Sequence, residues 1–243
     1  MNIEVLADSE SVAERAASVI ADYAKEAVAS RGSFIMAVSG GHTPWIMLRR
    51  LAAAQIPWRA VHVVQVDERV APAGHTDRNL THLRESLLAD SPVPPDQLYA
   101  MPVESPDLEA AAGSYAATLR TIAGEPPVLD LVHLGLGPDG HTASLVPGDP
   151  ALDVDNADVA LSGLYQGRRR MTLTYPILNR SRRIPWVVTG GDKASMVNRL
   201  LDGGRGIPAG RVSGDRALLL ADSAAAGQRT SKTEESYARR DRN

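Results

Sequence analysis

The stretch that decides the fold is residues 128–148, VLDLVHLGLGPDGHTASLVPG. Its first part, residues 128–134, is an apolar run bounded by turn residues, which is typical of a strand buried on both faces of a sheet. The second part is a glycine-rich turn with four polar side chains, Asp139, His141, Thr142 and Ser144. Residues 142–145 then predict a helix start or a tight turn. A buried strand that ends in such a turn is a common way to build an active site in an open α/β sheet, although the glycines also fit a plain turn.

Length and composition describe a globular chain. The 243 residues suit one large α/β domain or at most two small ones. The hydrophobic content of 44% is ordinary, but aromatic residues make up only 4%, so the core must rest on Val, Leu, Ile and Ala. There is no cysteine, which excludes a disulfide framework and a thiolate metal site.

Charge and targeting signals narrow the possible partners. The net charge of −3 creates no field that favours nucleic acid or an anionic membrane. The N-terminus carries acidic residues where a signal peptide needs basic ones, and no apolar run approaches the length of a membrane span. We therefore expect a cytoplasmic protein that binds neither nucleic acid nor membrane.

Strands and helices alternate along the whole chain. Apolar runs predict strands at residues 3–7, 34–38, 61–66, 128–134, 184–189 and 216–221, with shorter ones at 97–101, 159–164 and 171–174. Helical periodicity predicts helices at residues 11–30, 44–54, 80–88, 107–122 and 193–201. This order predicts the α/β class: a single-domain, Rossmann-like, mostly parallel sheet flanked by helices over residues 1–221. Residues 222–243 are polar and are expected to form a flexible tail.

A second glycine-rich turn follows the predicted strand 34–38. Residues 39–44 read SGGHTP, so Gly40 and Gly41 precede a helix that Thr43 can cap and that begins at a proline. Backbone N–H groups at such a helix start attract an anion, and the glycines let it approach closely. A strand-to-helix turn without a ligand fits the same residues.

Charged side chains follow two other buried strands. Asp67 and Arg69 come directly after the strand 61–66, where Arg69 can present its planar fork to a phosphate while an acid holds it. Lys193 follows two glycines after the strand 184–189. The basic residues 168–170, which include Arg170, form either a solvated turn or a further anion contact. Because the carboxyl ends of parallel strands meet at one sheet edge, we expect these groups to converge with His141.

The converging residues suggest a particular chemistry. Arg69, Lys193 and the turn at Gly40 make a plausible phosphate site. A neutral His141 oriented by Asp139 can take a proton from water. No Gly-x-Ser-x-Gly elbow, cysteine nucleophile or His-x-x-His spacing is present, so we expect neither a metal nor another cofactor. The chemistry that fits is general-base attack by water on a phosphorylated substrate.

Several motifs together resemble the 6-phosphogluconolactonase family. They are SGGHTP at residues 39–44, VDER at 66–69, GLGPDGHTASL at 135–145, GGDK at 190–193 and PA at 208–209. The resemblance implies a fold shared with glucosamine-6-phosphate deaminase. It also implies hydrolysis of 6-phospho-D-glucono-1,5-lactone to 6-phospho-D-gluconate, a step of the oxidative pentose phosphate pathway.

The resemblance further implies roles for individual residues. His141 matches the general base, and Arg69 and Lys193 match the residues that hold the phosphate. The residues Gly40, Gly41 and Thr43 match the phosphate-side loop, although His42 stands where the family commonly has serine. The expected partner is therefore a small phosphorylated sugar lactone, and we expect a monomer or a weak homodimer.

Two alternatives remain open at this stage. An amino-sugar-phosphate deaminase or a sugar-phosphate isomerase has the same fold, but the deaminases that resemble this chain carry a glutamate five residues after the histidine. This sequence has Val146 there, which favours hydrolysis. A non-catalytic sugar-phosphate sensor is the other alternative, and such sensors usually carry a DNA-binding module that this sequence lacks.

Overall fold

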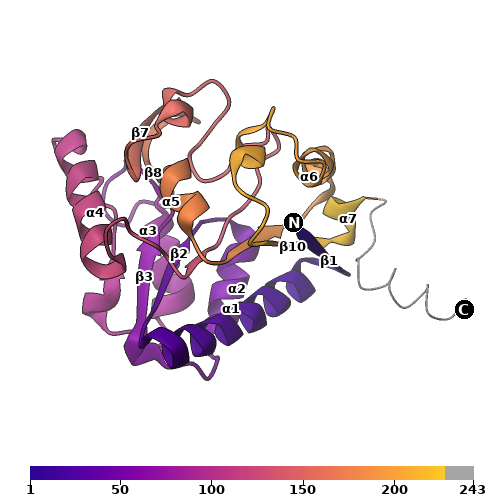
Figure 1. Cartoon of the computed structure of the whole chain (residues 1–243), viewed down its shortest axis with the longest axis horizontal. Helices are drawn as coiled ribbons and strands as arrows, with labels where there is room; N and C mark the ends of the chain where they lie inside the picture. Colours follow the sequence, from indigo (N-terminus) through magenta and orange to yellow (C-terminus); the bar gives the residue numbers. More distant parts are fainter. Residues whose placement is uncertain (228–243) are drawn as a thin grey trace, which may run out of the picture.

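The protein is built around a parallel sheet covered by helices on both faces (Figure 1). The computed structural model describes residues 1–227. The strands of the sheet are β1 (Asn2–Leu6), β2 (Phe34–Val38), β3 (Val61–Gln65), β5 (Leu98–Tyr99), β6 (Leu131–Val132), β9 (Ile184–Val188) and β10 (Ala217–Asp222). The helices are α1 (Ser9–Arg31), α2 (His42–Ala52), α3 (Asn79–Leu83), α4 (Leu108–Ala123), α5 (Tyr175–Arg180), α6 (Ala194–Leu201) and α7 (Ser223–Ala226).

Strand β6 joins two groups of parallel strands into one sheet. One group has the order β5-β3-β2-β6 and the other β9-β10-β1. The backbone N–H of Val132 donates to the carbonyl of Arg183 at 2.9 Å, and that of Leu134 donates to Pro185 at 3.0 Å. The continuous order is thus β5-β3-β2-β6-β9-β10-β1 with every pairing parallel. This confirms the predicted mostly parallel α/β fold.

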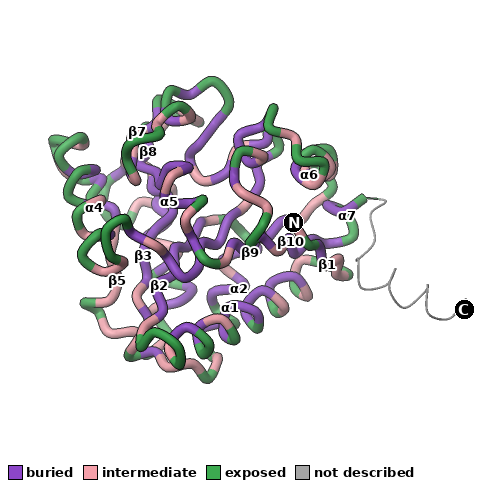
Figure 2. The backbone as a smooth tube through the Cα atoms, viewed as in Figure 1, coloured by how far each residue is buried: buried purple, intermediate pink, exposed green. Residues whose placement is uncertain are grey.

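Both faces of the sheet are buried, which explains the continuous apolar runs in its strands. In β2, Ile35 and Ala37 pack with residues of α4, α5 and α6. The alternate residues Phe34, Met36 and Val38 pack with α1 and α2 on the opposite face. Figure 2 shows buried residues along β2 and β3, whereas α1 alternates between buried and exposed positions. A strand between two helical layers has no solvent face and so shows no polar alternation.

A small antiparallel sheet extends the carboxyl end of β3. It consists of β4 (Asp67–Arg69), β8 (Arg168–Leu173) and β7 (Val159–Tyr165), in the order β4-β8-β7. The basic residues 168–170 are therefore part of a strand, and Arg170 pairs with Arg69 in the register of β4 and β8. The prediction of a turn there is wrong. The turn is instead at Gln166 and Gly167, whose φ angles of 52° and 77° are both positive, as in the tight turns that suit hairpins.

Residues 142–145 form a tight turn, one of the two predicted alternatives, and no helix starts there. Other predicted details differ from the structure. The N-cap of α2 is Gly41, with a φ of 132°, and no side chain caps this helix, so the predicted cap by Thr43 is wrong. Helix α7 lies within the stretch expected to be a tail, and two of its alanines are buried. The rest of that stretch, residues 228–243, lies outside the described residues.

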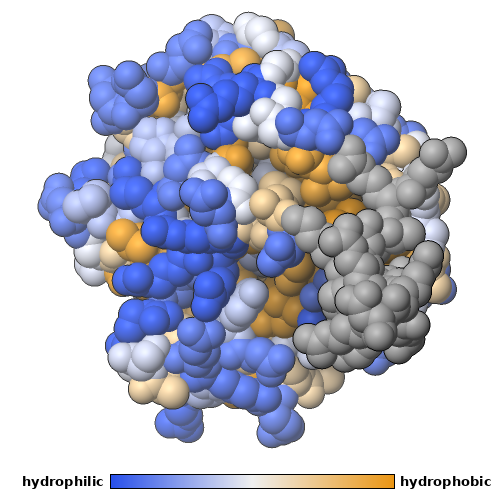
Figure 3. All heavy atoms as spheres, turned by 45° about the vertical axis from the view of Figure 1, so that its right-hand side comes forward, coloured by the Kyte–Doolittle hydropathy of each residue, from blue (hydrophilic) through white to orange (hydrophobic). Residues whose placement is uncertain are grey.

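The described surface carries mainly polar groups on the side that Figure 3 shows. Hydrophilic side chains cover the left half of this face, and apolar side chains gather around a hollow near its middle. Within residues 1–227, the helices are too short or too polar to cross a membrane.

Candidate active site

A pocket of about 280 Å³ opens at the carboxyl ends of β2, β3, β6 and β9. The four strands are neighbours in the sheet, so the turns that follow them meet at one edge. The pocket is lined by the predicted site residues Gly40, Asp67, Arg69, His141, Arg170 and Lys193. It is also lined by Asn79 and Gln166, which sequence reasoning did not assign to the site. Asp139 contacts His141 from outside the lining, and Gly41 and Thr43 do not line the pocket.

The geometry around His141 defines its tautomer. Its Nδ1 lies 2.6 Å from Oδ1 of Asp139, and its backbone N–H donates to the same oxygen at 3.1 Å. A carboxylate accepts hydrogen bonds, so the ring proton belongs on Nδ1 and leaves Nε2 as a proton acceptor. Burial raises the pKa of Asp139, but the hydrogen bonds from His141 outweigh this effect and keep the pKa below its ordinary value.

Tyr165, at the end of β7, completes this network. Its hydroxyl donates to Oδ2 of Asp139 at 3.1 Å and lies 3.3 Å from Nδ1 of His141. The two rings meet edge to face, with centroids 5.3 Å apart. Burial and the hydrogen bond to Asp139 raise the pKa of Tyr165, so the phenol stays neutral and keeps its proton for donation. No sequence signal marks Tyr165, because β7 is separated from the histidine turn in the chain and meets it only in space.

Gly137 gives the imidazole its position. A Cβ atom built on Gly137 would lie 2.0 Å from Nδ1 and 2.1 Å from Cε1 of His141. The ring therefore occupies the space that any side chain at position 137 would need. The glycine is required by this close approach of the base to the backbone.

Two arginines from the small antiparallel sheet supply positive charge. Arg69 donates from Nη1 to the carbonyl of Asp77 at 2.8 Å and to Oδ1 of Asn79 at 3.0 Å. Arg170 donates from Nη2 to Oε1 of Gln166 at 3.1 Å, and its guanidinium lies 4.9 Å from the ring centre of Tyr165. Burial and then the charge of Arg69 lower the pKa of Arg170. An anion between these two like charges would relieve their repulsion.

Lys193 provides a third cation from the turn that follows β9. It ends the short 3-10 turn Gly191–Lys193 that follows β9. Its ammonium group pairs with the carboxylate of the neighbouring Asp192, and this hydrogen bond lowers the pKa of Asp192. Asp192 is largely exposed, so the pair can open toward a ligand at little cost.

Acidic residues beside the arginines have a structural task. Asp67 is buried and accepts from the hydroxyl of Ser144 at 2.5 Å and from Nδ2 of Asn79 at 3.1 Å. Both contacts join the turn after β6 and the start of α3 to β4. The geometry thus makes Asp67 a support for the site, although it also lines the pocket.

Glu68 organises the start of α3, a role that sequence reasoning missed. This fully buried carboxylate accepts from the backbone N–H groups of Asn79 and Leu80, each at 2.8 Å, and pairs with Nε of Arg78 at 3.1 Å. It therefore satisfies two of the first backbone donors of α3, which no side chain at the helix's own N-cap satisfies. Asn79 is free to contact Arg69 and Asp67 instead.

Hydrogen bonds to residues at the ends of β6 and β9 fix the glycine loop that follows β2. The backbone N–H of Ser39 donates to Nδ1 of the buried His133 at 3.2 Å, and burial lowers the pKa of His133 to about 4. Thr43 shares a 2.7 Å hydrogen bond with Thr189, which ties the loop to the end of β9. A Cβ atom on Gly40 would lie 2.1 Å from Oδ1 of Asn79, so only glycine fits beside that amide.

The arrangement combines an oriented histidine with a group of cations. Within the described part of the chain, no three His, Asp or Glu side chains come together in a way that could hold a metal ion. The site can bind an anion with Arg69, Arg170 and Lys193 while His141 accepts a proton.

Comparisons with known proteins place the chain in a family. Residues 7–220 match the family described as glucosamine-6-phosphate isomerases/6-phosphogluconolactonase, and the chain belongs to it. A 6-phosphogluconolactonase from Synechocystis is 36% identical over 195 residues, which cover 79% of this chain and 81% of that protein.

Solved structures agree with the fold. The structure of a 6-phosphogluconolactonase from Trypanosoma brucei has a TM-score of 0.83 at 26% identity and covers 93% of this chain and 97% of that one. A monomeric glucosamine-6-phosphate deaminase has a TM-score of 0.82 at 20% identity over 94% of this chain and all of that one, which shows that the fold is the same. The resemblance noted from the motifs is thus confirmed.

Proposed function

We propose that this protein is a 6-phosphogluconolactonase that hydrolyses 6-phospho-D-glucono-1,5-lactone to 6-phospho-D-gluconate. The observation that carries the proposal is the His141–Asp139 pair beside a pocket with three cations. The sequence identity of 36% to a relative named 6-phosphogluconolactonase supports the choice of this lactone as the substrate.

In the proposed mechanism, His141 acts as a general base. Its Nε2 takes a proton from a water molecule as that water attacks C1 of the lactone, and the resulting imidazolium returns a proton to the ring oxygen as the C1–O bond breaks. Asp139 orients the ring and stabilises its protonated form, while Tyr165 holds Asp139 in place. A lactone carbonyl is an activated ester, so water assisted by a base is a sufficient nucleophile.

The cations are proposed to bind the 6-phosphate. Arg69, Arg170 and Lys193 line the pocket with His141, so an anion held there directs the far end of the sugar toward the base. Because the phosphate takes no part in the bond changes, its binding energy serves to orient the reacting carbon. The backbone N–H groups of the turn at Gly40 are proposed to donate hydrogen bonds to the phosphate.

A deaminase is the second candidate, and one position argues against it. Val146, which stands where the deaminases carry a glutamate, is an apolar buried residue. Asp149, a nearby acid, is committed to the backbone N–H groups of Ala151 and Gly163 at 2.8 Å each. Aldose–ketose chemistry needs an additional acid–base group that this site does not offer at that position.

The test is to follow the decay of freshly made 6-phosphogluconolactone with and without the protein. Acceleration that persists in EDTA is expected, because the proposed base is a side chain. The same preparation of His141→Ala is the control for contaminating activity. Absence of acceleration would refute the lactonase proposal, whereas activity abolished by EDTA would refute the metal-free mechanism. Cytoplasmic location and a monomer or weak homodimer stay predictions, which fractionation and sedimentation would check.

A further inference from the structure

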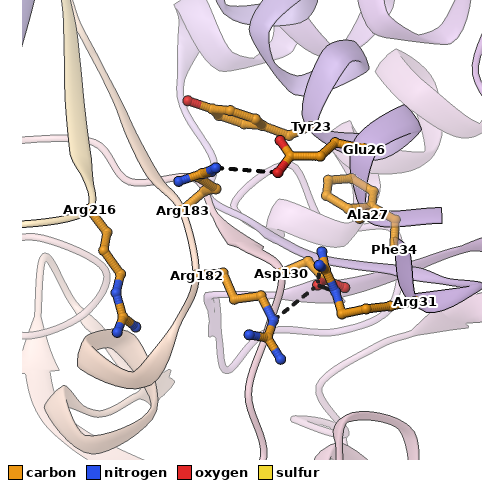
Figure 4. Close-up of a pocket in the computed structure, with 9 residues that line it drawn as sticks. All are labelled: Tyr23, Glu26, Ala27, Arg31, Phe34, Asp130, Arg182, Arg183 and Arg216. Carbon is orange, nitrogen blue, oxygen red and sulfur yellow. Dashed lines mark hydrogen bonds and ion pairs between the residues drawn. The ribbon is translucent and has the colours of Figure 1, made fainter. Parts of the chain in front are cut away.

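A second pocket lies at the amino ends of the parallel strands, on the edge of the sheet opposite the candidate active site (Figure 4). Its volume is about 330 Å³. Phe34 begins β2, Asp130 precedes β6, Arg182 and Arg183 precede β9, and Arg216 precedes β10. These strands are neighbours in the sheet, and the last turns of α1 close the pocket from the side with Arg31.

The residues that line this pocket carry more positive than negative charge. Four guanidinium groups face two carboxylates, those of Asp130 and Glu26, which leaves a formal excess of two positive charges. The whole chain has a net charge of −3, and three more carboxylates, those of Glu4, Asp22 and Asp215, lie with Arg183 and Arg216 along an adjoining pocket, so the excess belongs to the lining of this pocket. The partial negative charge at the carboxyl end of α1, about half an elementary charge, offsets only part of this positive excess. A concave site with excess charge of one sign concentrates ions of the opposite sign.

One of the four arginines is used by the fold. Nε of Arg31 donates to Oδ1 of Asp130 at 2.9 Å, and the other oxygen of Asp130 accepts from the backbone N–H of Ile35 at 2.9 Å. Asp130 is almost completely buried and links the end of α1 to β2. Its charge is therefore balanced by Arg31, and this pair needs no ligand.

The other three arginines are held by longer contacts. Arg182 lies 3.5 Å from Asp130, and Arg183 lies 3.4 Å from Glu26. Arg216 donates from Nη1 to the carbonyl groups of residues 180 and 181 at 3.4 and 3.3 Å. Each guanidinium has five N–H donors, so these contacts use a small part of their capacity. The guanidinium carbon of Arg183 lies over the ring of Tyr23, 5.1 Å from its centre, in a cation–π contact.

We propose that this pocket binds a small phosphorylated anion through Arg182, Arg183 and Arg216. In the view of Figure 4, the guanidinium of Arg182 lies between those of Arg31 and Arg216, and Arg183 comes from the next residue of the chain. Donors from two segments, residues 182–183 and residue 216, can approach the terminal oxygens of a tetrahedral phosphate from several directions, whereas a planar carboxylate accepts only in one plane. The volume suits a small molecule.

The test is calorimetric titration with pyrophosphate, and with citrate as the carboxylate probe. The background is the full chain carrying Arg69→Ala and Lys193→Ala, which removes two of the three cations of the active site. In this background, Arg182→Ser with Arg216→Ser is expected to weaken pyrophosphate binding by at least about tenfold, the effect of losing charge-assisted contacts. Arg49→Ser with Arg50→Ser removes the same charge from an exposed part of α2 and is expected to change nothing.

Equal weakening by both pairs, or no binding of pyrophosphate at all, would overturn the site. Citrate binding as tight as that of pyrophosphate would overturn its assignment to phosphate. Thermal unfolding of each variant shows whether it folds. If the double replacement unfolds, Arg183→Gln, which leaves the contacts of Arg31 and Arg216 intact, is expected to weaken pyrophosphate binding in the same direction, and unchanged binding would count against the proposal.

Discussion

The two edges of the main sheet hold pockets of similar size but of different composition. The pocket at the carboxyl edge, about 280 Å³, combines three cations with an oriented histidine. The pocket at the amino edge, about 330 Å³, has four arginines and no histidine. Positive charge is common to both, so both pockets can attract anions. The proton acceptor and the glycines that make room for it are the features that separate the proposed catalytic edge from the proposed binding edge.

The largest effect is expected from the base itself. His141→Ala should lower kcat for lactone hydrolysis by a factor on the order of 10²–10⁴, the usual contribution of general-base help. His62→Gln, a histidine on β3 whose ring contacts Tyr99, is the matched control and should retain activity. Wild-type kcat in His141→Ala would remove the main difference between the two edges.

The space beside the base is the next test. Gly137→Ala places a Cβ atom 2.0 Å from Nδ1 of His141, so the ring must move and kcat should fall by about 10²-fold, as small misplacements of catalytic groups do. A Cβ atom at Gly135 meets nothing within 4 Å, so Gly135→Ala should leave kcat nearly unchanged and act on KM. Equal kcat values in the two variants would show that the backbone at Gly137 does not position the base.

The cations at the carboxyl edge should act mainly on binding. Arg69→Ala and Lys193→Ala each remove a charged donor proposed for the phosphate, so KM should rise by roughly ten- to hundredfold with a smaller change in kcat. Arg182→Ser at the amino edge is the control and should leave KM for the lactone unchanged. Unaltered kinetics in both carboxyl-edge variants would move the phosphate to another part of the molecule.

The buried His133, near the carboxyl edge of the sheet, should make the free energy of unfolding depend on pH. The folded-state pKa of His133, about 4, lies below its unfolded value, so between these values the unfolded chain binds the proton and stability falls as pH falls. Its contribution should reach about 2 kcal/mol at pH 5 relative to pH 7.5. Urea unfolding of wild type and His133→Asn at both values measures the difference, which should shrink by that amount in the variant. Replacing the exposed His42 in His42→Ser should leave the difference in unfolding free energy between the two pH values unchanged.

The smallest effect is expected from the support of the base. Tyr165→Phe removes the hydroxyl that donates to Asp139 at 3.1 Å and leaves the ring in place. The loss of one hydrogen bond, about 1 kcal/mol, should lower kcat about fivefold. Tyr99→Phe, which loses a hydroxyl contact to His62, is the control. If kcat in Tyr165→Phe matched wild type, Asp139 would hold the imidazole without help.

Local sequence patterns predicted the architecture because the burial of each element determines which of its positions are apolar. Strands β2, β3 and β9 lie between two helical layers, so they read as unbroken apolar runs and were predicted to within a residue or so. Strand β6 is shorter than its apolar run, since pairing on both sides fixes only Leu131 and Val132 as strand, and Leu134 forms an isolated bridge. The basic residues at 168–170 resemble a turn because they are charged. They form a strand because they pair with another charged segment, β4, and the composition of residues 168–170 gives no sign of that partner.

For this protein, the sequence by itself determined the parallel α/β fold, the family, and the strand ends that carry Arg69, His141 and Lys193. These are properties of short segments and of chain direction, because the carboxyl ends of parallel strands share one edge. Only the tertiary structure decided which side chains meet across that edge: Tyr165 behind Asp139, Asn79 beside Arg69, and Glu68 at the start of α3. It also decided that four arginines, scattered through the chain, gather at the opposite edge. Such contacts depend on how distant segments pack, and no local pattern records them.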